Sequence, residues 1–136
     1  METSCFYSSF IFIINVLVAF YCGYYLYATL FFALLMTSLL YHIQSIPATK
    51  ILDKIAIFSI VIYGGYIFYQ KISSPLERDP RLSFLIVFTL LLVAFMYYYG
   101  YLYQCLCFCD DPAQANLFHS VMHLIVSLGH CCVCFL

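Results

Sequence analysis

Residues 82–109, "LSFLIVFTLLLVAFMYYYGYLYQCLCFC", form a stretch of 28 residues that contains no charged side chain. As a helix rising 1.5 Å per residue, this stretch would be about 42 Å long, whereas about 20 residues cross the hydrocarbon core of a bilayer. Two spans would need about 40 residues. The stretch therefore predicts one transmembrane helix, at about residues 82–104.

The composition extends this conclusion to the whole chain. Of its 136 residues, 66% are hydrophobic and 8% are charged, and the mean hydropathy is +1.03. A globule of this size could not bury so much apolar surface, because small domains keep much of their surface in contact with water. The net charge of −1 and the lack of a basic run exclude nucleic acid as a partner. We expect an all-α, multi-pass integral membrane protein.

Polar and helix-breaking residues divide the rest of the chain into apolar segments of spanning length. Gly23 separates the first two segments, and "QSIPATK" (44–50), "QKISSPLERDPR" (70–81) and "CDDPAQAN" (109–116) separate the others. The first segment could also be a signal peptide, but it has neither a basic start nor a small-residue cleavage site. We therefore expect one helical domain with five spans, at about residues 5–22, 24–43, 52–69, 82–104 and 117–136.

The last segment, "LFHSVMHLIVSLGH" at residues 117–130, holds three of the four histidines. His119 and His123 are four residues apart, so on a helix they lie about 40° and about 6 Å apart, on one face. With five antiparallel spans, the end of the second span lies at the same membrane face, where His42 could supply a third imidazole. Three protein ligands and one open position are typical of catalytic zinc, which acidifies a water molecule in the open position.

Two further polar residues are expected at the same depth. Ser38 precedes His42 by one helical turn, and Asp53 begins the third span, where its carboxylate could orient a ligand imidazole or accept a proton from zinc-bound water. Such groups are costly in lipid unless they satisfy one another. In the alternative, the histidines hydrogen-bond at the membrane interface and Asp53 is the N-cap of its helix. The spacing alone leaves both interpretations open.

His130 is expected to lie apart from this group. It follows His123 by seven residues, so it shares the same face but lies about 10.5 Å deeper. Imidazoles that share one zinc ion each bond it at about 2.1 Å, which this separation does not allow. His130 would either line a cavity or hydrogen-bond to a neighbouring backbone group or tyrosine, and we expect the second.

The same residues resemble a known superfamily. "SLLYHIQSIPATKILDKIAIF" (38–58) is similar to the Ser-x-x-x-His and following Asp of the superfamily that joins alkaline ceramidases, progestin and adipoQ receptors, bacterial haemolysin III proteins, Per1 and myomaker-like proteins. "FHSVMHLIVSLGH" (118–130) resembles its final His-x-x-x-His. The resemblance implies zinc ligation by the three histidines and support of the metal-bound water by the serine and the aspartate; these positions are His42, His119, His123, Ser38 and Asp53.

The resemblance also implies a function. Members have seven spans, with three helices between the aspartate-bearing helix and the last, where this chain has room for one. Losing two helices preserves the parity of the spans, so the site could still assemble. We expect a zinc-dependent, ceramidase-like intramembrane hydrolase acting on an amide or ester of a membrane lipid, with sphingolipids as candidate substrates. The alternative is a non-catalytic, zinc-stabilised membrane protein of the receptor, haemolysin-like pore-forming or membrane-remodelling type.

The eight cysteines lie near the predicted membrane edges rather than in paired loops. A disulfide framework is typical of small extracellular domains, which this chain lacks. S-acylation, a second site for a soft metal, and simple packing as small apolar residues remain open interpretations. Gly64 and Gly65, in the third span, indicate a close contact between helices.

Overall fold

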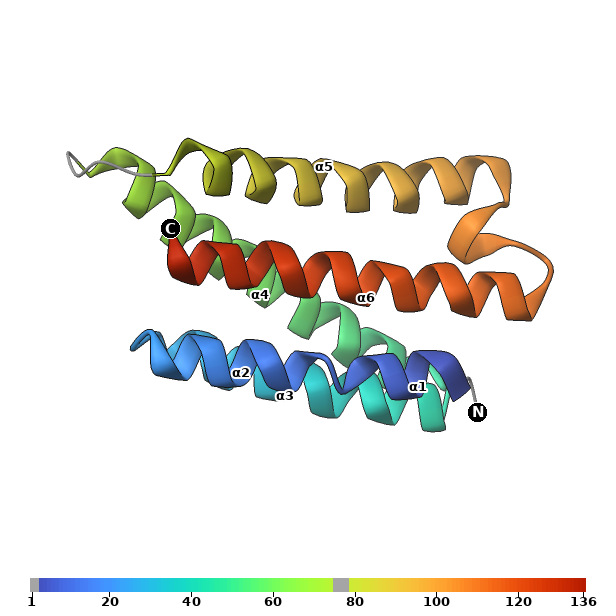
Figure 1. Cartoon of the computed structure of the whole chain (residues 1–136). Helices are drawn as coiled ribbons and strands as arrows, with labels where there is room; N and C mark the ends of the chain where they lie inside the picture. The colour runs from blue at the N-terminus through green and yellow to red at the C-terminus, as the bar shows by residue number, and fades with distance from the viewer. Residues whose placement is uncertain (1–2, 75–78) are drawn as a thin grey trace.

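The computed structural model describes residues 3–74 and 79–136, and the regular elements in these ranges are all helices (Figure 1). Their bounds are as follows: α1 (Thr3–Ser9), α2 (Phe12–Tyr21), α3 (Tyr25–Ile43), α4 (Pro47–Ser73), α5 (Pro80–Tyr103), the short 3-10 helix η1 (Leu106–Phe108) and α6 (Pro112–Phe135). Among the described residues, five segments are long and apolar enough to cross a membrane, with α1 and α2 together forming the first. The prediction of an all-α bundle with about five spans is confirmed.

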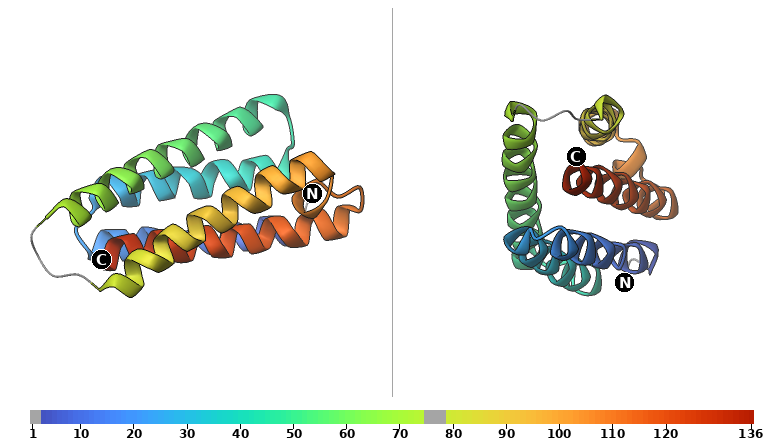
Figure 2. Two further views of the ribbon diagram at one scale, coloured as in Figure 1. Left: turned by 90° about the horizontal axis from the view of Figure 1, so that it is seen from above. Right: turned by 60° about the vertical axis from the view of Figure 1, so that its left-hand side comes forward.

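Consecutive spans run in opposite directions (Figure 1). The N-terminus, the connection between α3 and α4 and the connection between α5 and α6 lie at one end of the bundle, and the C-terminus lies at the other. Figure 2 shows α6 between α5 and the first span, while α4 crosses the bundle obliquely. Residues 75–78 of the expected polar loop lie outside the described residues.

Two helices begin earlier than the hydropathy pattern suggests. α4 starts at Pro47 rather than near residue 52, and α6 starts at Pro112 rather than near residue 117. Proline suits the first helical position because its φ is already helical and its missing N–H would have no partner there. Asp111 caps α6, its carboxylate accepting a hydrogen bond of 2.9 Å from the backbone N–H of Ala113. These prolines begin helices as well as ending the preceding connections.

The first span is divided into α1 and α2. The N–H groups of Phe10 and Ile11 bond to carbonyl oxygens three residues back, at 3.2 and 3.1 Å, so the backbone tightens there. The hydroxyls of Ser8 and Ser9 donate to the carbonyl of Cys5, at 3.0 and 2.8 Å. Serine hydroxyls that bond to the preceding turn bend helices. The break is absent from the predicted spans because every residue around it is compatible with a continuous apolar helix.

Gly23 forms the predicted turn between the first two spans. Its φ is +80°, in the left-handed region that glycine adopts without a steric penalty. The turn folds α2 back against α3. The buried apolar core then forms mainly where α2, α3, α4 and α6 meet, around Phe12, Tyr27, Phe31 and Ile60.

The glycine pair in α4 behaves asymmetrically. A Cβ atom on Gly64 would collide with the Tyr27 hydroxyl and lie 3.0 Å from Nδ1 of His130, whereas a Cβ on Gly65 would meet nothing within 4 Å. Gly64 therefore allows α4 to approach α3 and α6 closely, as predicted, and Gly65 does not contribute to that contact.

The cysteines form no disulfide bond within the described residues. Cys132 and Cys134 are buried in the apolar core. Their positions favour the interpretation of these two as small apolar packing residues.

Candidate metal centre

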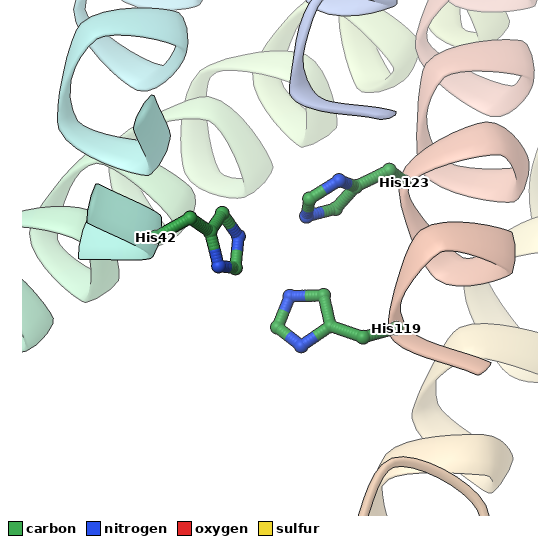
Figure 3. A group of neighbouring side chains, drawn as sticks. All are labelled: His42, His119 and His123. Atoms are coloured by element: carbon green, nitrogen blue, oxygen red, sulfur yellow. The ribbon is translucent and has the colours of Figure 1, made fainter. Parts of the chain in front are cut away.

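Three imidazoles from two helices converge near one end of the bundle. They belong to His42 in the last turn of α3 and to His119 and His123 in the first half of α6, and we call them the histidine triad. Each offers a ring nitrogen, and the three nitrogens all lie within 4.8 Å of one another. Figure 3 shows the rings directed toward a common space between the two helices. Because consecutive spans run in opposite directions, the end of α3 and the start of α6 lie at the same end of the bundle. His42 therefore meets two histidines that are far from it in the sequence.

The triad matches the donor set and nearly the size of a zinc site. In a tetrahedral site with zinc–nitrogen bonds of about 2.1 Å, ligand nitrogens lie about 3.4 Å apart, so each nitrogen would move inward by less than about 1 Å. Imidazole nitrogens suit zinc and other transition metals, whereas magnesium and calcium prefer oxygen ligands. Three ligands also leave one tetrahedral position open. The residues present therefore fit a bound zinc ion.

Burial makes these imidazoles unusual for a membrane helix. His42 is 3% exposed and His123 is 8% exposed, while His119 is partly buried. Polar side chains inside a membrane bundle are rare and face one another or a functional pathway. Two of the three imidazoles are turned into the protein rather than toward its surroundings.

The first span contributes to the triad, which the sequence analysis did not foresee. Oγ of Ser8 lies 2.8 Å from Nδ1 of His123. The ring of Phe12 packs against the same imidazole, with ring centroids 5.1 Å apart. The sequence indicates this contact only through Ser8 and Ser9, two adjacent hydroxyls in an apolar segment that is predicted to start at the same membrane face. It does not indicate that the first span lies beside α6.

Ser38 lies on the buried face of α3, one turn before His42, as predicted. It is fully enclosed, and its Oγ lies 2.9 Å from Oγ of Ser9, so it too is tied to the first span. Ser8 and Ser9 of α1 thus reach the two parts of the candidate site, Ser8 the part on α6 and Ser9 the part on α3.

Asp53 is buried inside α4 rather than at its start. It follows Pro47 by six residues, so the alternative in which it is the helix N-cap is wrong. Its Oδ1 is buried and has no hydrogen-bond partner among the described residues. Asp53 does not belong to the group of converging ligand atoms. Asp53 lies on α4, which packs against α3.

His130 lies apart from the triad, as predicted. The hydroxyl of Tyr27 hydrogen-bonds to Nδ1 of His130, and the ring of Phe31 packs against the imidazole at 5.4 Å between centroids. The expectation of a histidine bonded to a neighbouring tyrosine is confirmed. Its role is to join α6 to α3 deeper in the bundle.

The chain matches no protein-family model, no curated protein and no solved structure. The resemblance of residues 38–58 and 118–130 to the ceramidase and adipoQ-receptor superfamily therefore remains a prediction.

Proposed function

We propose that this chain is a zinc-dependent intramembrane hydrolase that cleaves an amide or ester bond in a membrane lipid. The observation that carries the proposal is the convergence of His42, His119 and His123, whose ligating nitrogens lie within 4.8 Å of one another in an apolar bundle. Three imidazoles with one open position are typical of catalytic zinc, whereas structural zinc sites are usually closed by four protein ligands.

The chain supplies the other groups that hydrolysis needs. A bound zinc ion would acidify a water molecule and polarise the substrate carbonyl. Asp53 is a buried carboxylate whose Oδ1 remains available to accept a proton, as a general base must. Ser38 adds a hydroxyl on the same face of α3 as His42. Because the bundle lies in the bilayer, the substrate we propose is a lipid, with ceramide-like amides as the first class to test.

One observation favours a second, non-catalytic function. α3 and α6 make few close backbone contacts and the first span packs against both, so a metal at the triad would directly pin two helices that otherwise meet around His130. A zinc-stabilised receptor, pore-forming or membrane-remodelling protein would use the triad in this way.

The first experiment measures bound metal. We expect the purified protein to contain one zinc ion per chain by elemental analysis, and His42→Ala, His119→Ala and His123→Ala each to lose it. His130→Ala is the matched control, since this histidine lies on α6 but about 10.5 Å along the axis from His123. Wild-type zinc content in all three triad variants would refute the site.

The second experiment separates catalysis from a structural role. It measures fatty acid released from a panel of ceramides and lipid esters by wild type and by Asp53→Asn. We expect the variant to keep its zinc and lose activity, because the amide preserves the shape of the side chain but does not accept the proton. Full activity in Asp53→Asn would exclude the aspartate as the base. A zinc-loaded wild type that hydrolyses no lipid, together with a lower melting temperature for His119→Ala, would favour the non-catalytic function.

A further inference from the structure

α1 reaches the histidine triad through a short chain of two hydrogen bonds. Oγ of Ser8 lies 2.8 Å from Nδ1 of His123, and the same hydroxyl lies 3.0 Å from the carbonyl oxygen of Cys5, to which it donates. Ser8 follows Cys5 by three residues in the same short helix. Two consecutive hydrogen bonds therefore connect the imidazole of His123, through the hydroxyl of Ser8, to the backbone carbonyl of Cys5 in the first span.

The number of protons available indicates which group is the donor in each of these two hydrogen bonds. A serine hydroxyl has one proton and can accept through its oxygen, whereas a backbone carbonyl can only accept. When the Ser8 proton goes to the Cys5 carbonyl, the Ser8 oxygen accepts the proton carried by Nδ1 of His123. A neutral imidazole carries one N–H, so a proton on Nδ1 leaves Nε2 with the lone pair that a metal requires.

We infer that Ser8 is a positioning residue that holds His123 as the Nε2 metal ligand. The inference rests on the zinc site of the proposed function and adds a supporting residue from a helix that carries none of the three ligands. The hydrogen bond sets the tautomer of His123, and the packing of the Phe12 ring against the imidazole limits its rotation. Metal-bound histidines generally donate their second N–H to such a partner, and removing the partner typically weakens metal binding by about 10–100-fold.

The division of the first span supports the same role. The hydroxyl of Ser8 donates its own proton to the preceding turn, which leaves its oxygen to accept from His123, and that back-bonding accompanies the tightening of the backbone after Ser9. Ser9 provides the internal comparison. Its hydroxyl donates to the same carbonyl at 2.8 Å, yet it contacts Ser38 rather than a triad imidazole. Two neighbouring serines thus share one backbone acceptor but differ in whether they touch a ligand.

The decisive experiment replaces Ser8 with two side chains of nearly the same shape. Ser8→Thr keeps the hydroxyl and Ser8→Val replaces it with a methyl group, and the partial exposure of Ser8 leaves room for the added carbon. We expect the zinc dissociation constant, measured by competition with a chelator in detergent, to rise about 10–100-fold in Ser8→Val and Ser8→Ala. Ser8→Thr should stay within about threefold of wild type, and so should the control Ser59→Ala, which removes a hydroxyl that is bonded within its own helix, to the carbonyl of Ile55 at 2.8 Å.

A second readout distinguishes positioning from simple loss of structure. The visible spectrum of the cobalt-substituted protein reports ligand geometry, so it should change in Ser8→Val and remain unchanged in Ser59→Ala. The melting temperatures of the metal-free Thr and Val variants should agree, because the hydroxyl acts mainly through the ligand. Equal zinc affinity in these two variants would overturn the inference while leaving the zinc site intact. A wild type that binds no zinc would instead overturn both the inference and the proposed function.

Discussion

A second polar contact joins the first span to α6, two helical turns beyond Ser8, and it allows a quantitative test of the bundle. Asn15 is 2% exposed, and its Nδ2 donates to the carbonyl of Ser127 at 2.9 Å. The hydroxyl of Ser127 donates to Oδ1 of Asn15 at 2.6 Å, and Sγ of Cys131 lies 3.2 Å from Nδ2. Both the nitrogen and the oxygen of the Asn15 amide are therefore hydrogen-bonded to the same turn of α6.

The substitution Asn15→Leu removes these contacts while keeping a side chain of suitable size in the core. Measured hydrogen bonds between membrane helices average about 0.6 kcal/mol and reach about 1.7 kcal/mol, so two bonds are worth about 1–2 kcal/mol. The hydroxyl of Ser127 can turn to the carbonyl four residues back, which limits the penalty for losing its partner. We expect the free energy of unfolding to fall by about 1–2 kcal/mol.

The assay is equilibrium unfolding in mixed micelles titrated with a denaturing detergent, followed by circular dichroism. Thr29→Val is the matched control, because the hydroxyl of Thr29 is exposed and bonds only within its own helix, to the carbonyl of Tyr25 at 2.9 Å. The control should change stability by less than about 0.5 kcal/mol. If Asn15→Leu were no more destabilising than Thr29→Val, the reciprocal pair would not hold the first span to α6 as argued.

Two other predictions concern packing and topology. Gly64→Ala should lower the melting temperature, with a loss of about 1–3 kcal/mol, because the new Cβ would lie 3.0 Å from Nδ1 of His130; Gly65→Ala, which meets nothing within 4 Å, is the control and should not destabilise the protein. Single cysteines placed at residues 44–46 and 110–111 in a cysteine-poor background should react with an impermeant reagent from the same side of the membrane. Labelling from opposite sides would separate His42 from the rest of the triad and contradict the site.

Apolar length and helix-breaking residues were enough to predict the number of spans and the end of the bundle at which the proposed ligands lie. Apolar length limits residues 82–109 to one crossing, and Gly23 fixes where the chain reverses between the first two spans, since its backbone preference acts locally. The helix starts at Pro47 and Pro112 were not predicted, because hydropathy marks the apolar part of a helix and not its first turn. Once the crossings are counted, antiparallel parity alone brings His42 to the membrane face where the last span begins. The spacing of His119 and His123 then predicts a shared site, and the structure brings the three rings together.

Which helices lie side by side, and which faces they present to one another, could be found only from the assembled bundle. The contacts of Ser8 with His123, Asn15 with Ser127 and Tyr27 with His130 each join helices far apart in the sequence. In water, the polar side of a helix indicates its rotation, but in a bilayer the lipid-facing side is as apolar as the buried side. The rotation and the neighbours of each span are therefore set by close packing and by these few polar pairs, whose partners are found only when the helices assemble.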